Sequence, residues 1–488
     1  MLHFRTTRSG STYSNYYTVQ DPTFDLDALL RNAAADVEPY EEDPIGAEAS
    51  GDWIDELENP CSSPLTSPPS STPASRAPSL ERHAGPGPSA PLQPRATIVG
   101  KKRGKKERSR LYRAKKRARE REQWGPPTQG AKIRRGAQRI IEAENEATQI
   151  SWEDMPVTST GYTGKRGEGE SRTYSLDDLV GSNAKVPDMT YLDWDGRISK
   201  GITAPDGRVF AVLAGHPDDP SWPSVHTSLA EEIRACGEHV RFPVAASDHR
   251  RGRFGAQAYG VSHGGGQTAP ANLKHTRTME KALLHLLSLT SMVRIASFAS
   301  SVFSTWAPLL FAYYAEHMGA LFQNNPSLVR NFARSIWACV TINFGPRTVT
   351  FKHRDFGNLP FGWCAITALG QYNPDLGGHL VLWECRLVIR FPPGSTVLIP
   401  SAIIHHSNTR IARNERRYSV TQYTAGALFR WVDHGCKLDE IYYKSLTADG
   451  KARALAANAR RWKEGVELWS TIGDLREAAR RVVDASGR

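Results

Sequence analysis

The sequence predicts an α+β protein built on an antiparallel jelly roll (a double-stranded β-helix), with supporting helices and a long disordered N-terminal region before it. Three observations lead to this prediction. Short runs rich in β-forming residues, separated by turn residues, fill residues 336–435. Apolar residues recur at helical spacing in residues 276–335 and again near the C-terminus. Residues 1–96 have a composition that cannot support a packed core.

The N-terminal region, residues 1–96, is acidic at first and then rich in proline, serine and alanine. Such a segment buries too little apolar area to offset the entropy of an ordered chain, so we expect disorder. Residues 1–10 show no apolar stretch after a basic start, so no secretory signal is expected. The six cysteines lie far apart and form no C-x-x-C pair, which favours a reducing intracellular compartment.

A dense run of positive charge opens residues 97–173, which we interpret as a basic segment and linker. Residues 101–121 hold thirteen of the 62 Lys and Arg residues and two of the 51 acids, which leaves 49 of each elsewhere. Cations so close together repel one another without an anionic partner, so we predict a nucleic-acid arm or a nuclear localisation signal. The alternative is a solvated, charged helix. The arm residues are Lys101, Lys102, Arg103, Lys105, Lys106, Lys115, Lys116 and Arg117. The expected location is nuclear, or otherwise cytoplasmic.

The folded domain is expected over residues 174–437. It begins with a hairpin at about residues 202–213, where a Pro-Asp-Gly turn separates apolar runs. Residues 251–272 are rich in glycine but lack the Lys-Ser/Thr pair of a phosphate-binding loop, which indicates a long loop beside the site. Helices follow over residues 276–335. Their most apolar part, residues 282–314, contains charged residues and a proline, so we interpret it as buried helix and expect no membrane partner.

After these helices the hydrophobic pattern changes to short β-rich runs separated by glycine and proline. The expected strands are residues 338–344, 348–351, 363–368, 379–383, 387–391, 395–399, 403–407 and 417–424. Beyond them the pattern returns to helix. We therefore expect a C-terminal helical extension over residues 438–488, with its helix at about 451–483.

A metal-binding pattern lies among these strands. Residues two apart on a strand point the same way, so His353 and Asp355 would present two ligands together. An iron centre that activates dioxygen needs two imidazoles and one carboxylate on one face. The third ligand must come from a distant strand, where His405 and His406 are candidates that face opposite sides. The chemistry favours His406, and the alternative to a metal site is a jelly roll with satisfied core histidines.

A cosubstrate pattern follows eleven residues after His406. Arg417 and Ser419 share a strand face, and a guanidinium beside a hydroxyl suits the distal carboxylate of 2-oxoglutarate. We therefore predict Fe(II) and 2-oxoglutarate as cofactors. The alternative is that Arg417 pairs with a nearby acid such as Glu415.

Together these residues resemble the TET/JBP group of 2-oxoglutarate oxygenases, which oxidise 5-methylpyrimidines in DNA, and most closely its fungal, often transposon-associated branch. The resemblance covers about residues 190–435. Its most specific segments are HRDFGN at 353–358, GGHL at 377–380, PGSTVLIP at 393–400, HSN at 406–408 and the stretch 417–431. It implies His353, Asp355 and His406 as iron ligands, with Arg417 and Ser419 as the 2-oxoglutarate clamp.

The resemblance also implies substrate-binding residues. Asn358 stands where the animal enzymes have the asparagine that contacts the flipped base. Tyr423 stands where they have the aromatic residue that stacks on that base. The alternatives are that Asn358 is only a turn residue and that Tyr423 is only a core residue of its strand. Ala425 stands where the animal enzymes have a histidine that reads cytosine, and their cysteine-rich zinc module is absent. This departure puts cytosine recognition in doubt.

Three functions follow as hypotheses. The first is oxidation of a methylated nucleobase in DNA, which must be flipped out of the duplex to be reached. The second is the same chemistry on RNA, a protein side chain or a small molecule. The third is a catalytically inactive nuclear protein of transposon origin that binds nucleic acid through residues 101–121. An intact ligand set beside Arg417 argues against the third.

Overall fold

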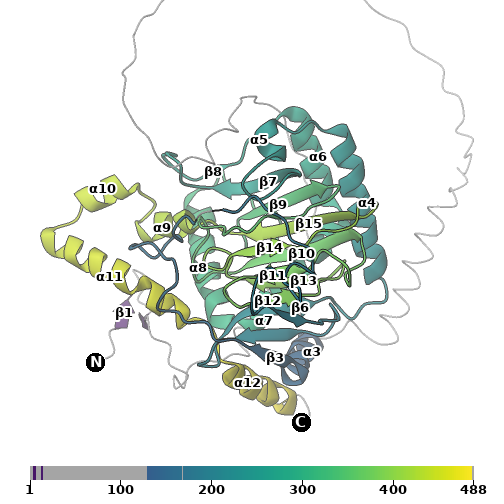
Figure 1. The fold of residues 1–488 in the computed structure, drawn as a ribbon. Helices are drawn as coiled ribbons and strands as arrows, with labels where there is room; N and C mark the ends of the chain where they lie inside the picture. Colours follow the sequence, from purple (N-terminus) through teal and green to yellow (C-terminus); the bar gives the residue numbers. More distant parts are fainter. Residues whose placement is uncertain (1–3, 7–11, 15–128, 168, 486–488) are drawn as a thin grey trace, which may run out of the picture. The chain divides into compact units, whose positions relative to one another are not determined.

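The computed structural model describes residues 4–6, 12–14, 129–167 and 169–485 (Figure 1). Residues 4–6 and 12–14 form a two-stranded hairpin, β1 (Phe4–Thr6) with β2 (Thr12–Ser14). The basic segment at residues 101–121, including every predicted arm residue, lies outside the described residues. The remaining described residues form two further sheets and a set of helices. The mixed α+β class is confirmed.

The larger sheet has nine strands in the order β3-β5-β6-β13-β10-β15-β9-β7-β8. Its strands are β3 (Glu144–Ala147), β5 (Lys200–Thr203), β6 (Val209–Gly215), β13 (Thr396–Ile399), β10 (Cys364–Gln371), β15 (Arg416–Tyr423), β9 (Cys339–Gly345), β7 (Gly255–Ser262) and β8 (Ala271–Asn272). Neighbours pair antiparallel except β3 with β5. β5 and β6 form the predicted hairpin.

The smaller sheet has the order β14-β11-β12-β4, with β14 (His406–Asn408), β11 (Leu380–Leu382), β12 (Leu387–Ile389) and β4 (Thr190–Leu192). Side chains alternate along β11. Leu380 and Leu382 join the buried cluster that also contains Ala365 and Val397 of the large sheet, so the two sheets share a core. Val381 instead packs into a separate cluster on the outer side. A two-sheet core agrees with the predicted jelly roll, whose full topology stays a prediction.

Four long helices lie over the large sheet: α4 (Trp222–His239), α6 (Arg277–Ser288), α7 (Thr290–Trp306) and α8 (Pro308–Asn324). Buried apolar residues of α4, α6 and α7 form one cluster with residues of β9, β10 and β15, which places these helices on one face of the sheet (Figure 1). α6 begins where the Thr276 hydroxyl accepts a hydrogen bond from the Met279 N–H (3.4 Å). Among the described residues no single helix is long and apolar enough to cross a membrane, and the one pair that reaches that length, α6 with α7, is bent by 67°.

The described fold starts before the predicted boundary at residue 174. α3 (Gln129–Glu142) buries Ala137 and Ile140 in the main core, where they meet the buried face of α12 (Ile472–Ala485). β3 then extends the large sheet. The sequence did not reveal this because the apolar face of α3 is narrow and lies among arginines that continue the basic composition.

The C-terminal region, where helix was expected at about 451–483, holds α10 (Asp439–Lys444), α11 (Ala448–Val466) and α12, and α9 (Gly426–Asp433) lies just before it. The side chains of Thr447 and Thr471 accept hydrogen bonds from the N–H groups of Gly450 and Asp474, both 3.1 Å. Each threonine therefore starts a new helix, which divides the continuous helical pattern into separate elements.

Two local predictions were wrong. Residues 251–272 are not one long loop, because β7 and β8 form within them, and a short α5 (Val244–Ser247) precedes them. Residues 348–351 are not a strand. There the Thr348 N–H donates to the carbonyl of Arg417 (2.9 Å) and the Phe351 N–H to the carbonyl of Arg251 (2.8 Å). These hydrogen bonds go to two different segments, so no continuous ladder forms.

Candidate metal centre

A backbone bridge brings the two predicted histidine ligands together. The N–H of His353 donates to the carbonyl of His406 (3.1 Å), and the N–H of His406 donates to the carbonyl of His353 (2.9 Å). Directly opposite residues that exchange both hydrogen bonds are a fixed antiparallel pair. The N–H of Asp355 donates to the carbonyl of Ser401 (2.8 Å), in the segment between β13 and β14. His353 and Asp355 therefore lie on a loop, rather than on the regular strand that was predicted. This loop is tied to β14, which carries His406.

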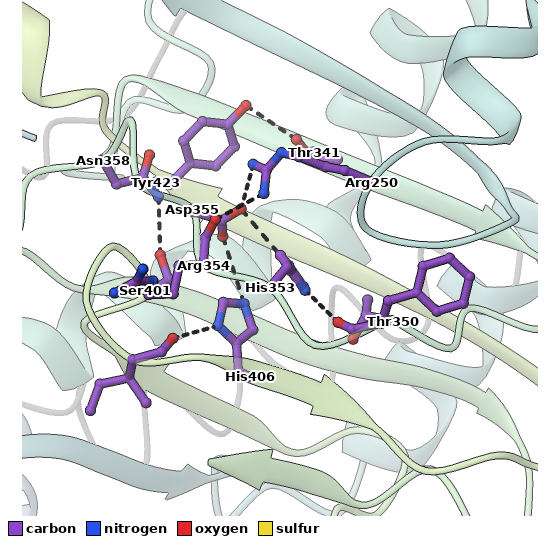
Figure 2. A network of polar contacts seen from close by, with 12 residues as sticks. Arg250, Thr341, Thr350, His353, Arg354, Asp355, Asn358, Ser401, His406 and Tyr423 are labelled. Carbon is purple, nitrogen blue, oxygen red and sulfur yellow. Dashed lines mark hydrogen bonds and ion pairs between the residues drawn. The ribbon is translucent and has the colours of Figure 1, made fainter. Parts of the chain in front are cut away.

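The three side chains point toward one another (Figure 2). Their candidate ligand atoms all lie within 4.8 Å of one another. The carboxylate of Asp355 lies 3.9 Å from Nε2 of His353 and 3.7 Å from Nε2 of His406. Both imidazoles are buried, while the Asp355 side chain keeps 18% of its exposure. Asp355 is thus the member of the cluster that keeps some exposure.

The hydrogen bonds of the imidazoles determine which nitrogen faces the cluster. Nδ1 of His353 donates to the carbonyl of Phe351 (2.7 Å), and Nδ1 of His406 donates to the carbonyl of Ile404 (3.0 Å). A carbonyl only accepts, so each ring carries its proton on Nδ1. Nε2 keeps its lone pair for a metal ion, and the carbonyl fixes the orientation of the ring.

The charges of the cluster suit a divalent cation. Burial, reinforced by the neighbouring His406, lowers the pKa of His353 well below its usual value, and burial lowers the pKa of His406. Burial alone would raise the pKa of Asp355, but the imidazoles of His353 and His406 and nearby guanidiniums bring it to about 2. At neutral pH the cluster therefore presents two neutral imidazoles and one carboxylate, a donor set suited to non-haem iron.

His405 does not join this cluster. Its Nδ1 lies 2.6 Å from Oε1 of Glu384, and its backbone N–H donates to Oε2 of the same carboxylate (2.8 Å). Adjacent residues in an extended chain face opposite sides, so clamping His405 on Glu384 directs His406 inward. The geometry therefore brings together His353, Asp355 and His406.

Arg417 lies on β15 with its side chain almost fully buried, at 1% exposure. Its Nη1 donates to the carbonyl of Thr348 (2.8 Å), while its Nε has no hydrogen-bond partner. Among the described residues no carboxylate oxygen comes within 4.0 Å of this guanidinium. Glu415 instead accepts from the N–H groups of Asn373 (2.7 Å) and Ala412 (2.8 Å). The predicted alternative, an Arg417–Glu415 pair, is therefore not formed.

A buried guanidinium without a carboxylate is costly unless an anion reaches it. Ser419, two residues further along β15, is also buried, and its hydroxyl accepts a hydrogen bond from Nδ2 of Asn343 (2.8 Å). The hydroxyl hydrogen is left to donate elsewhere. Arg417 and Ser419 could therefore both donate to a carboxylate ligand, and the predicted 2-oxoglutarate clamp stays a prediction.

The two predicted substrate residues lie in the same neighbourhood (Figure 2). Nδ2 of Asn358 donates to the hydroxyl of Ser401 (3.0 Å), and Asn358 forms a backbone bridge with Ala425. The Tyr423 hydroxyl accepts from Thr341 (3.2 Å), and burial raises the pKa of Tyr423 well above its usual value. Asn358 thus lies opposite Ala425.

Sequence reasoning missed Arg250. Its Nη1 donates to the carbonyl of Arg354 (2.9 Å), its Nη2 lies 3.6 Å from the carboxylate of Asp355, and its guanidinium lies over the ring of Phe356 (5.2 Å). Arg250 therefore holds the loop that carries two of the three cluster residues. It lies about a hundred residues earlier in the chain, and no spacing in the sequence could have linked it to Asp355.

Fold and site together define a mixed α+β protein with a His–Asp–His cluster that could hold a metal ion. No family model matches the chain, and no curated protein matches it. Among solved structures, the chain is similar to NgTET1 in complex with 5mC DNA, with a TM-score of 0.33 and 13% identity over 49% of this chain and 83% of that chain. A TM-score of this size does not establish a shared fold.

Proposed function

We propose that this protein is an Fe(II)- and 2-oxoglutarate-dependent dioxygenase that oxidises a methylated nucleobase in DNA. The observation that carries the proposal is the buried His353, Asp355 and His406 cluster together with the buried guanidinium of Arg417, which has no carboxylate partner among the described residues. A metal site alone would fit many proteins. A metal site with a separate buried site for a carboxylate fits a smaller class, in which the cosubstrate is a dicarboxylate.

Each residue has a defined role in this proposal. Nε2 of His353, Nε2 of His406 and the carboxylate of Asp355 would hold iron(II), which together with 2-oxoglutarate supplies dioxygen-dependent hydroxylation of a C–H bond. Arg417 and Ser419 would bind the distal carboxylate of 2-oxoglutarate, because Nε of Arg417 has no hydrogen-bond partner and the Ser419 hydroxyl accepts from Asn343, which leaves its hydrogen to donate.

The substrate part of the proposal rests on Asn358 and Tyr423. A base that leaves the duplex needs a hydrogen bond on its edge and a flat surface for stacking. The amide of Asn358 is half-buried and held by Ser401, and the Tyr423 ring is held by its hydroxyl. Both side chains are therefore fixed in place near the cluster. With the basic segment at residues 101–121, this arrangement also leads us to propose a nuclear location.

The decisive experiment is mass spectrometry of methylated DNA, methylated RNA and methylated histone peptides after incubation with the protein, iron(II) and 2-oxoglutarate. Oxidised bases in DNA, with succinate formed in equal amount, would support the proposal. The variant Asp355→Ala is the matched control for each substrate. Oxidation of RNA or peptide alone would keep the reaction type and replace the substrate.

Ala425 favours a second candidate, the same chemistry on a different substrate. Opposite Asn358 the chain presents a methyl group where a hydrogen-bonding imidazole would read cytosine. A site with this gap suits a base other than a cytosine derivative, or a different polymer. The panel of substrates above separates these cases.

A further inference from the structure

Residues 164–167 and 169–174, called the strap here, run antiparallel to the loop that carries the cluster residues. At one end the N–H of Gly164 donates to the carbonyl of Phe356 (2.8 Å). At the other end Glu170 forms a backbone bridge with Lys352. The strap and the loop thus share a boundary that passes directly beside the metal centre.

Cations lie over aromatic rings along this boundary. The guanidinium of Arg166 lies 6.0 Å from the centre of the Phe356 ring, and that of Arg250 lies 5.2 Å from the same ring. At the other end, Nζ of Lys352 lies 4.3 Å from the centre of the Trp383 ring. Each contact supports a cation against a flat surface.

The pattern continues beyond the loop. The guanidinium of Arg172 lies 4.7 Å from the ring of Tyr174, and that ring meets Trp383 edge to face at 5.2 Å. Cation–ring pairs therefore lie on both sides of the segment that holds His353 and Asp355. We call the cations of this boundary the rim: Lys165, Arg166, Arg172, Arg250 and Lys352.

The rim carries excess positive charge. Lys165, Arg166 and Arg172 are exposed, and no carboxylate oxygen of the described residues lies within 4.0 Å of their charged groups. Among the described residues three acids lie along the boundary: Asp355 lies 3.6 Å from Arg250, Glu170 accepts from the Tyr174 hydroxyl (2.8 Å), and Glu384 lies 2.6 Å from His405. The five cations of the rim outnumber these three carboxylates.

We propose that the rim binds the sugar–phosphate backbone of the nucleic-acid strand whose target base enters the metal centre. This inference rests on the proposed function and assigns its polymer contacts to the folded domain, separately from residues 101–121. A guanidinium beside an aromatic ring offers a surface on which a base can stack, and its N–H donors can reach a phosphate. An acidic polypeptide could pair with the charges but has no bases to stack on these guanidinium–ring pairs.

The test is fluorescence anisotropy of labelled 20-nucleotide single strands and duplexes in EDTA, without 2-oxoglutarate. The background is the full chain in which the eight arm residues Lys101, Lys102, Arg103, Lys105, Lys106, Lys115, Lys116 and Arg117 are replaced by glutamine. In this background, the double variant Arg166→Gln with Arg172→Gln should bind the oligonucleotides about 10-fold more weakly near 0.15 M salt. The salt dependence should flatten by roughly two ion equivalents.

The matched control is Arg453→Gln with Arg460→Gln on α11, which removes the same charge from side chains that are 72% and 51% exposed. It should leave the salt slope nearly unchanged. Arg166→Lys with Arg172→Lys should keep the salt slope but lose part of the affinity, because it retains the charges and removes the guanidinium planes.

Two outcomes would overturn the inference: equal losses in the rim and control variants, or competition by poly-glutamate as strong as by unlabelled oligonucleotide. Preference for single strand, duplex or RNA identifies the polymer. Because binding is measured without metal or cosubstrate, an inactive enzyme would leave this result intact. A failed rim would likewise leave 2-oxoglutarate turnover unaffected.

Discussion

His353 and His406 face each other across a two-way backbone bridge, and each ring donates Nδ1–H to the carbonyl two residues before it. Two segments more than fifty residues apart thus present their Nε2 atoms in the same way to one carboxylate. Backbone hydrogen bonds fix the two residues relative to each other, so we expect the site to be preorganised for metal binding.

The first prediction concerns the choice between adjacent histidines. His406→Ala should remove Mn(II) or Co(II) binding in equilibrium dialysis, because it deletes one of three ligands. His405→Ala should keep a measurable site, since His405 contacts Glu384 instead of the cluster. Asp355→Ala should behave as His406→Ala does. Loss of metal in His405→Ala with retention in His406→Ala would reverse our assignment.

The second prediction separates cosubstrate binding from folding. Arg417→Ala should raise the 2-oxoglutarate requirement about 100-fold or more, because the distal carboxylate loses its charged partner, while metal binding persists. Succinate formation titrated with 2-oxoglutarate measures this. Arg416→Ala, an exposed neighbour on the same strand, is the control. A lowered melting temperature with an unchanged 2-oxoglutarate curve would make Arg417 purely structural.

The third prediction concerns pH and the buried His379. Burial lowers the pKa of His379 to about 4, and the side chain is fully buried. The unfolded chain therefore binds a proton near pH 6.5 that the folded chain refuses until about pH 4, so stability falls as pH drops through this window. The contribution of His379 is at most about 3 kcal/mol.

Urea unfolding at pH 7 and pH 4.5, in EDTA, measures this dependence. His379→Gln should lose part of it, and the exposed His285→Gln should not. An identical pH dependence in the two variants would contradict the assignment.

The fourth prediction concerns the basic arm. Removing residues 101–121 should weaken nucleic-acid binding and flatten its salt dependence, because thirteen cations release counterions when they bind phosphate. Turnover of a short oligonucleotide should persist, since no cluster residue lies in that segment. Unchanged salt dependence would limit the segment to a localisation signal or a solvated helix.

Local patterns in the sequence predicted the elements whose cause is local. Short β-rich runs between turn residues located β9, β10 and β15, and helical spacing located helices in the region of α6, α7 and α8, because these signals lie within each element's own residues. The ligand set was visible for the same reason: His353 and Asp355 stand two residues apart, and a second histidine follows at a distance.

The tertiary structure alone decided which groups meet. It turned His406 rather than His405 inward through the clamp on Glu384, left Arg417 buried without Glu415, and brought Arg250 to Asp355. These outcomes depend on hydrogen bonds between segments twenty to a hundred residues apart. Spacing along a chain carries no information about such pairings, because they form only when both sheets have closed around the shared core.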